Sequence, residues 1–115
     1  MSKYELYLNE ILRAIELIEK SIKGKSFEEF KSNRETIDAN SMRLQIIGES
    51  ISKLPKEIIS KYKEITWREF LQTRNIISHA YFAVNAKIIW SILKEEVPKL
   101  KDVIQKIKRD IKDDE

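Results

Sequence analysis

The sequence predicts an all-α protein, an up-and-down bundle of four to five helices in a single domain that spans residues 1–115. Isoleucine, leucine, lysine and glutamate dominate, while the 115 residues include only two glycines and two prolines. That composition favours helix over sheet. Apolar residues also recur at alternating steps of three and four along several stretches, which is the pattern of a helix with one buried face.

Composition also narrows the class of protein. Charged residues make up 36% of the chain, and the net charge of +3 permits nucleic-acid binding without arguing for it. The chain has no cysteine, which excludes disulfides and thiolate metal ligands. No apolar run approaches the ~20 residues of a membrane span, and the first ten residues, MSKYELYLNE, lack the apolar segment of a signal peptide. We therefore expect a cytoplasmic protein with no membrane contact.

The first helix is expected over about residues 2–23. Its apolar residues form one continuous stripe at steps of four and three: Tyr4, Leu8, Ile11, Ile15, Ile18 and Ile22. Gly24 follows as a stop, because glycine adopts the left-handed conformation that ends many helices. Lys23 at the end of the helix suits the negative end of the helix dipole.

Two capping-box patterns follow, SFEE from Ser26 and SNRE from Ser32. They predict a short helical turn and then a new start into a longer helix over about residues 33–53. The inner face of that longer helix consists of Ile37, Leu44, Ile47, Ile51 and Leu54. Gly48 inside it costs about 1 kcal/mol relative to alanine, so we expect another backbone to approach closely there.

Pro55 is expected to begin a short helix over about residues 56–62, because a proline in the first turn loses no required donor. A third capping box, TWRE from Thr66, opens a helix that carries Trp67, Phe70, Leu71 and Arg74. Asn85 is a suitable N-cap for the final helix, whose stripe contains Ile89, Leu93, Val97, Leu100, Ile104, Ile107 and Ile111. Pro98 should kink or interrupt this helix, and the acidic tail of about residues 110–115 should be frayed.

The residues with chemical potential gather in RNIISHAY, residues 74–81, which contains the only histidine, His79. No glycine-rich phosphate loop, zinc cluster or acidic metal site fits the sequence. Histidine is the side chain best suited to proton transfer near neutral pH, and the guanidinium of Arg74 offers a fork of donors that fits a phosphate. Asn75 and Tyr81 complete the polar set.

Helix geometry separates the two main candidates. Five residues place Arg74 and His79 about 140° apart around a helix of ~3.6 residues per turn. Both reach one ligand only if the helix ends or loosens near Ser78, or if two chains of a homodimer complete the site. By residue chemistry alone, the commoner role of a lone histidine at a helix end is a cap or a satisfied core group. Tyr81 is likewise more often a half-buried core aromatic.

RNIISHAY resembles the signature of the HEPN superfamily, in which an arginine and a polar neighbour precede a histidine after a short spacer. The tyrosine two residues after the histidine is similar to that of the HepT-like toxins. LQIIGES at residues 44–50 resembles their Ile-Gly-Glu-Ala segment, and Trp67 and residues 84–90 also match in style. The resemblance covers nearly the whole chain and implies a HEPN-like helical bundle. The sequence departs from the usual pattern at Ser50, Ala80 and Asn85.

This resemblance implies the toxin of a type VII-like toxin–antitoxin system. Such a toxin is a metal-independent endoribonuclease without a cofactor, in which the ribose 2′-hydroxyl attacks the adjacent phosphate. The resemblance assigns proton transfer to His79, phosphate binding to Arg74 and positioning of these groups to Asn75. A homodimer would place two motifs across one cleft. The implied partner is a minimal nucleotidyltransferase antitoxin that transfers AMP to Tyr81 and thereby blocks RNA.

Two alternatives stand beside the ribonuclease. The first is a non-catalytic HEPN subunit that binds nucleotide or RNA next to a minimal nucleotidyltransferase. The second is a plain dimeric bundle in which the histidine is structural. The intact set of arginine, asparagine, histidine and tyrosine disfavours the plain bundle, but it does not separate the enzyme from the binding subunit.

Overall fold

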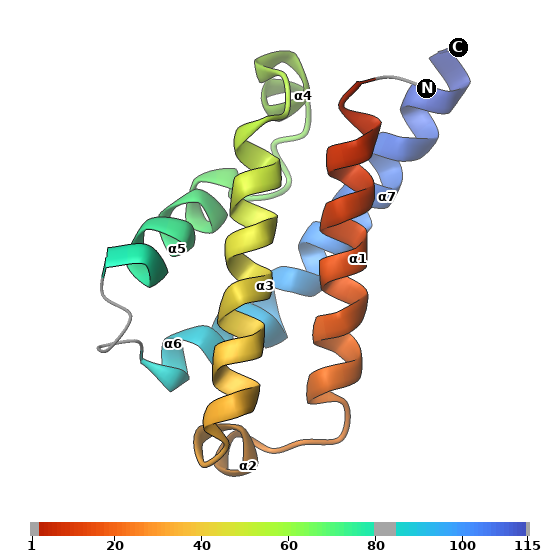
Figure 1. Cartoon of the computed structure of the whole chain (residues 1–115). Helices are drawn as coiled ribbons and strands as arrows, with labels where there is room; N and C mark the ends of the chain where they lie inside the picture. The colour runs from red at the N-terminus through yellow and green to blue at the C-terminus, as the bar shows by residue number, and fades with distance from the viewer. Residues whose placement is uncertain (1–2, 80–84, 115) are drawn as a thin grey trace.

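The chain folds into helices, as its composition and periodicity predict. The computed structural model describes residues 3–114 except for 80–84, with side chains described up to residue 73 and again over 85–112. Within this part, the four long helices are α1 (Glu5–Ile22), α3 (Arg34–Ser52), α5 (Trp67–His79) and α7 (Val97–Asp114) (Figure 1). Three short helices are α2 (Phe27–Lys31), α4 (Lys56–Lys61) and α6 (Ala86–Ser91), and the described residues form no strand. The predicted all-α class is confirmed.

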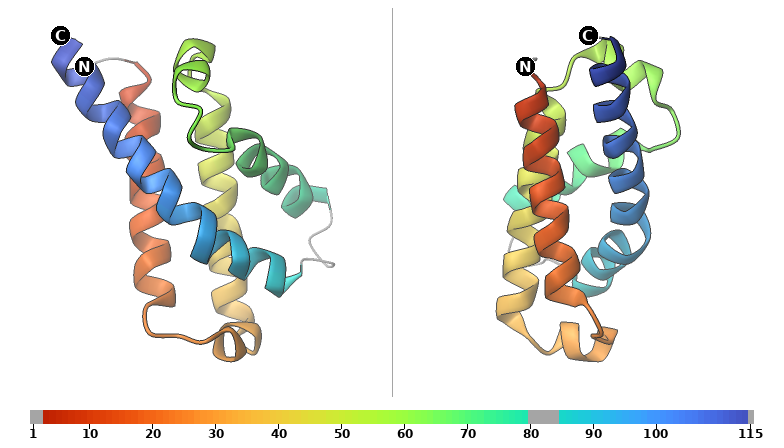
Figure 2. Two further views of the ribbon diagram at one scale, coloured as in Figure 1. Left: turned by 180° about the vertical axis from the view of Figure 1, so that it is seen from behind. Right: turned by 90° about the vertical axis from the view of Figure 1, so that its right-hand side faces the viewer.

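The long helices pack side by side in the order α5, α3, α1 and α7. Helices α1 and α3 run antiparallel and are connected through α2 (Figure 1). Helix α5 packs on α3, and α7 crosses α1 obliquely (Figure 2). Helix α6 packs against α2 and α3. Since α5 also packs on α3, the end of α5 and the start of α6 lie on the same side of α3 (Figure 1).

The predicted apolar stripes form the core of the bundle. Of the stripe residues on α1, α3 and the final helices, only Tyr4 and Ile111 are half-buried, and all the others are buried. Fully burying a leucine or isoleucine side chain stabilises a fold by roughly 1.5–3 kcal/mol, so these stripes are the main source of stability. None of the described helices combines the length and the apolar character needed to cross a membrane.

The helix starts test the predicted capping boxes. The first box is confirmed: the Glu29 N–H donates to Ser26 Oγ at 3.2 Å, and the Ser26 N–H donates to Glu29 Oε1 at 3.0 Å. The second box is wrong, because the N-cap of α3 is Asn33, whose Oδ1 accepts from the Thr36 N–H at 3.1 Å. An N-cap needs extended backbone. Asn33 has it, with φ −113° and ψ 98°, whereas Ser32 is still helical at φ −86° and ψ −3°.

Three helix boundaries agree with the sequence. Helix α1 gives way to Gly24, whose φ of +71° is the left-handed conformation expected of a glycine stop. Asn85 caps α6, and its Oδ1 accepts from the N–H groups of Lys87 at 2.8 Å and Ile88 at 3.4 Å. Pro55 precedes α4 in an extended conformation, as predicted for a short helix that begins at residue 56. The glycine stop at Gly24 and the N-cap at Asn85 are confirmed.

The interruption predicted at Pro98 takes the form of a π-helical turn. Residues Ile92–Glu96 (η2) join α6 to α7, and the N–H of Val97 donates to the carbonyl of Ile92, five residues earlier. Pro98 has no N–H, and its ring would crowd the carbonyl four residues before it in a regular helix. The wider turn just before the proline accommodates this missing bond within an otherwise continuous, bent helix (Figure 2).

The described part of the C-terminal tail is helical to Asp114, and the fraying expected over about residues 110–115 stays a prediction. Two contacts hold the start of this segment: the Asp110 carboxylate accepts a hydrogen bond from Tyr62, and half-buried Ile111 packs against the core. Gly48 is buried in α3, and the close backbone approach expected there stays a prediction.

Candidate functional site

Helix α5 divides into an anchoring half and a half that carries the candidate site. Trp67, Phe70 and Thr73, three residues apart, are only 6%, 1% and 3% exposed. The Thr73 hydroxyl donates to the carbonyl of Glu69 at 2.8 Å, which satisfies this buried polar group within the helix. The first two turns of α5 are therefore fixed in the core, and the turns that carry Arg74 to His79 extend beyond them.

The backbone from Arg74 to His79 is uninterrupted helix. The helix is thus unbroken between these two residues, while a helix end just after His79 would fall outside the described residues and stays a prediction. On a regular helix the Arg74 and His79 positions lie about 140° apart, whereas Asn75 and His79, four residues apart, lie about 40° apart on one face. The positions of Asn75 and His79 therefore share one face of α5, and the position of Arg74 lies on another face.

The remaining candidate, Tyr81, lies outside the described residues, which resume at Asn85. The start of α6 there exposes Ile88, which is 53% accessible. Among the residues that the structure describes, no group of three or more histidine, cysteine, aspartate or glutamate side chains is arranged to hold a metal ion.

The outer face of α3, the helix on which α5 packs, carries two exposed apolar side chains. Met42 is 57% exposed and Ile46 is 38% exposed, one helical turn apart. We call this pair the α3 patch. Large apolar side chains at adjacent turns of one face are a common feature of protein–protein contact surfaces. The α3 patch is therefore an exposed apolar surface on the helix next to α5.

A buried polar cluster lies between α1 and α3, and periodicity gave no signal for it. The Asn40 side chain is 0% exposed, and its Nδ2 donates to Ser21 Oγ at 3.0 Å and to the Thr36 carbonyl at 2.9 Å. Its Oδ1 accepts from Arg43 Nη1 at 3.1 Å. Next to it, the buried Ser41 hydroxyl has no hydrogen-bond partner among the described residues. The Asn40 amide is thus fully hydrogen-bonded: it joins α3 to α1 through Ser21, and it accepts a bond from the half-exposed Arg43.

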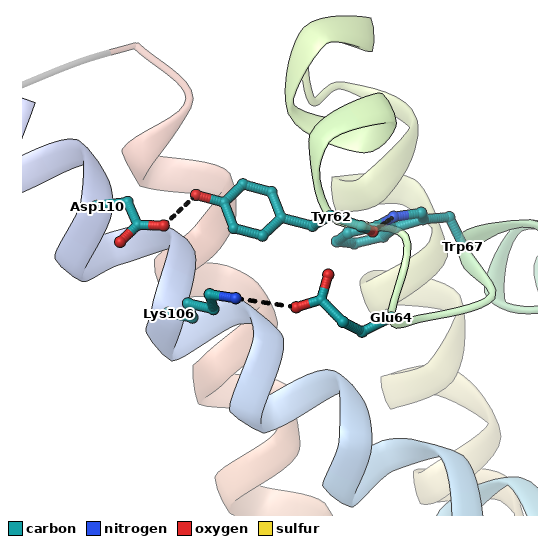
Figure 3. A network of polar contacts seen from close by, with 5 residues as sticks. All are labelled: Tyr62, Glu64, Trp67, Lys106 and Asp110. Atoms are coloured by element: carbon teal, nitrogen blue, oxygen red, sulfur yellow. Dashed lines mark hydrogen bonds and ion pairs between the residues drawn. The ribbon is translucent and has the colours of Figure 1, made fainter.

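A second polar network links the start of α5, through the segment before it, to α7 (Figure 3). Trp67 Nε1 donates to the carbonyl of Tyr62 at 2.8 Å, and the Tyr62 hydroxyl donates to Asp110 Oδ2 at 2.5 Å. Lys106 Nζ donates to Glu64 Oε2 at 3.2 Å. A hydrogen bond from the backbone of Glu64 itself, and then the bond from Lys106, lower the pKa of the Glu64 carboxyl. Sequence patterns give no sign of this network, because its members lie up to 48 residues apart.

An all-α bundle with an arginine, a neighbouring asparagine and a histidine on the last turns of one helix has the features of a HEPN protein. The family described as "Ribonuclease HepT-like" matches residues 11–107. That span contains all four long helices apart from the first turns of α1 and the last turns of α7. The chain belongs to the HepT-like ribonuclease family of the HEPN superfamily, and the predicted resemblance is confirmed.

Relatives with assigned names agree with this family. The chain is 37% identical over 103 residues to "Probable ribonuclease HepT" of Thermococcus cleftensis, covering 90% of this chain and 94% of that protein. It is 38% identical over 106 residues to a "Putative RNase" of Caldanaerobacter subterraneus, covering 89% and 95%.

A longer relative shares the same region. The chain is 41% identical over 107 residues to the "Gamma-glutamylcyclotransferase and putative RNase" of Methanocaldococcus jannaschii. The match covers 93% of this chain but 48% of that protein, so the chain spans about half its length. No solved structure matches the chain.

Proposed function

We propose that this chain is a metal-independent endoribonuclease that acts as the toxin of a type VII-like toxin–antitoxin pair in the cytoplasm. The observation that carries the proposal is the intact set of Arg74, Asn75 and His79 on the last turns of α5, in a chain of the HepT-like ribonuclease family. The names of the relatives, which describe ribonucleases, support the same reaction class.

In the proposed reaction the ribose 2′-oxygen attacks the adjacent phosphorus, and the bond from phosphorus to the 5′-oxygen of the next nucleotide breaks. The products are a 2′,3′-cyclic phosphate and a free 5′-hydroxyl. His79 accepts the proton of the 2′-hydroxyl or returns a proton to the departing 5′-oxygen. Arg74 binds the phosphate oxygens and stabilises the charge that develops on them, and Asn75 orients His79 from the preceding turn.

We further propose that two chains complete each site. The uninterrupted helix from Arg74 to His79 supports this, because one α5 presents the two positions about 140° apart. A two-fold axis beside α5 would let Arg74 of one chain face His79 of the other. The exposed α3 patch, Met42 and Ile46, provides apolar surface for such a contact on the helix next to α5.

Mixing two inactive variants tests this composite site. Arg74→Ala should lower cleavage by about 10²–10³-fold, as does loss of a charge-stabilising donor elsewhere. His79→Ala should lower it by about 10²–10⁴-fold. In a mixed dimer one of the two composite sites is complete, so subunit exchange should restore about a quarter of wild-type activity. No recovery in mixtures that mass spectrometry shows to contain mixed dimers would contradict the composite site.

The reaction class itself needs a separate experiment. Purified chain without its partner is incubated with RNA in EDTA, beside the Arg74→Ala and His79→Ala variants. Cleavage by the wild type that both variants lose, with a cyclic phosphate in the product, supports the enzyme. Binding of RNA without cleavage, lost in Arg74→Ala, would favour the alternative of a non-catalytic HEPN partner of a nucleotidyltransferase. Equal background in all three samples would sink the ribonuclease proposal.

The proposed antitoxin is a minimal nucleotidyltransferase that modifies Tyr81. The Tyr81 phenolic oxygen would attack the α-phosphorus of ATP, pyrophosphate would leave, and the phenol would lose its proton. The added AMP would bring negative charge and bulk next to Arg74 and His79 in sequence, which would exclude RNA from the site. After co-expression, intact mass should rise by one or more AMP units in the wild type and stay unchanged in Tyr81→Phe.

A further inference from the structure

The orientation of α5 depends on few neighbours. Among the described elements, α5 packs mainly against α3, so its core contacts fix it along one side. A helix held along one side can still pivot across that contact, so that its far end swings, unless a second point is fixed. The second point in this fold is the first residue of α5, Trp67, whose indole N–H donates to the carbonyl of Tyr62 in a buried bond of 2.8 Å.

Tyr62 in turn is tied to α7. Its side chain is 3% exposed, and its hydroxyl donates to the Asp110 carboxylate at 2.5 Å (Figure 3). A hydrogen bond with an ionised partner is about twice as strong as a neutral one. One turn earlier on α7, Lys106 pairs with Glu64 at 3.2 Å, but both side chains are 50% exposed. An exposed ion pair contributes little, so Tyr62 is the principal link from α7 to the start of α5.

The link matters for the site because a small tilt at the start of α5 moves the far end of the helix by a larger distance. At ~1.5 Å rise per residue, roughly 18 Å separate Trp67 from His79 along α5. A tilt of only about 5° at the first turn would move the last turn by roughly 1.5 Å over that length. Misplacing a catalytic group by about 1 Å can cost about 10²-fold in rate. A small change at the start of α5 is therefore amplified where Arg74 and His79 lie.

We propose that Tyr62, bonded through its hydroxyl to Asp110 and through its carbonyl to Trp67, is a positioning residue that sets the orientation of the catalytic half of α5. Its effect on cleavage rests on the proposed ribonuclease function, whereas its effect on the mobility of α5 does not. Tyr62 touches neither RNA nor the reacting atoms in this scheme, so it should change turnover and leave RNA binding nearly unchanged.

Tyr62→Phe removes the hydroxyl and keeps the buried ring. The matched control is Tyr7→Phe, because half-buried Tyr7 packs on the core and its hydroxyl makes no hydrogen bond within the described residues. We expect Tyr62→Phe to lower kcat about tenfold with KM within about twofold, an effect smaller than the full cost of a 1 Å displacement. Tyr7→Phe should leave both values unchanged.

A second readout does not depend on activity. Amide hydrogen exchange should become faster by about tenfold or more across residues 67–79 in Tyr62→Phe, with α1 and α3 unchanged, which is the signature of local rather than global loosening. Asp110→Ala should reproduce both effects. Asp110→Asn keeps an acceptor oxygen for the Tyr62 hydroxyl and should retain most of the activity. Faster exchange confined to α5, with kcat lowered and KM unchanged, would not be expected if Tyr62 only added general stability.

The outcomes separate the two proposals. If the wild type does not cleave RNA, the ribonuclease proposal fails, and exchange over residues 67–79 alone decides the positioning role. If kcat is unchanged in Tyr62→Phe, or if exchange rises equally in α1, α3 and α5, the positioning role is overturned. Faster exchange confined to α5 together with a lower kcat supports it.

Discussion

Replacing Asn40 by alanine tests how much one buried amide contributes to this small bundle. Asn40 is 0% exposed, and its side chain makes hydrogen bonds of 3.0, 2.9 and 3.1 Å to Ser21, Thr36 and Arg43. Asn40→Ala removes all three bonds. Each contributes about 1 kcal/mol net, but Ser21 and Arg43 are half-exposed and can bond to water instead. Together with the small cavity left behind, we expect a loss of about 2–3 kcal/mol in the free energy of unfolding.

Thermal unfolding followed by helical circular dichroism measures this loss. For a chain of this size, 1 kcal/mol lowers the Tm by about 4 °C, so Asn40→Ala should melt about 8–12 °C below the wild type. The matched control is Asn9→Ala on α1, because Asn9 is half-buried and makes no side-chain hydrogen bond among the described residues. It should stay within about 0.5 kcal/mol of the wild type. All samples need equal concentration, since dimer formation would make the Tm depend on it.

A second substitution separates hydrogen bonding from volume. Asn40→Leu fills nearly the same space without polar groups, so a destabilisation of about 1–2 kcal/mol would report mainly on the lost bonds. Adding Ser21→Ala removes the partner left in the interface and should recover part of that loss. If the Tm of Asn40→Ala and that of Asn40→Leu both equal the Tm of the wild type, the buried amide does not stabilise the α1–α3 interface, and the prediction is wrong.

Three further predictions follow from the ends of the helices. Asn85→Ala should cost about 1 kcal/mol in urea unfolding by removing the cap of α6, whereas Asn85→Asp should cost much less because the carboxylate still accepts. Gly24→Ala should cost about 1 kcal/mol in the same assay through its φ of +71°, since no atom lies within 4 Å of an added Cβ, and Gly24→Asn should cost less. Hydrogen bonds from the Ser26 backbone and then its side chain lower the pKa of Glu29 from its ordinary 4.5, so the first capping box stabilises the fold above that pH and is lost as the pH falls through the lowered value. An NMR titration of the Glu29 carboxyl should show the lowered pKa, and Glu29→Gln should remove this part of the acid sensitivity; a carboxyl that titrates at 4.5 would contradict the capping box.

The elements that could be predicted from the sequence are those specified locally. A stripe such as Ile11, Ile15 and Ile18 repeats within a few residues, and its burial follows from helix geometry alone. Caps at Ser26 and Asn85 and the interruption at Pro98 depend on one or two neighbouring residues, and each is present. The fold class and most helix boundaries were therefore predictable without knowledge of tertiary contacts.

Predictions were wrong or incomplete where competing local signals or distant contacts decide the outcome. Ser32 fits a capping-box pattern, but the preceding helix holds its backbone in a helical conformation, and Asn33 becomes the cap. The sequence also gave no sign of the hydrogen bond from Tyr62 to Asp110, which joins residues 48 positions apart. No local pattern marks such a pair, because tyrosine and aspartate are often found on protein surfaces. Only the packing of the helices brings these two side chains together.

The candidate site shows the same division between local and tertiary information. The sequence identified Arg74, Asn75 and His79 by their chemistry, and it allowed either a broken helix or a second chain to unite them. Helix α5 is unbroken from Arg74 to His79, and this observation supports the second chain that we propose as part of each site. A site divided between two helices in this way tolerates little rotation of either, because an error in one α5 changes the distance to the other chain as well. The anchors at the start of α5 and the surface where two chains meet would then both control turnover. Substitutions far from RNA should therefore affect kcat before they affect binding.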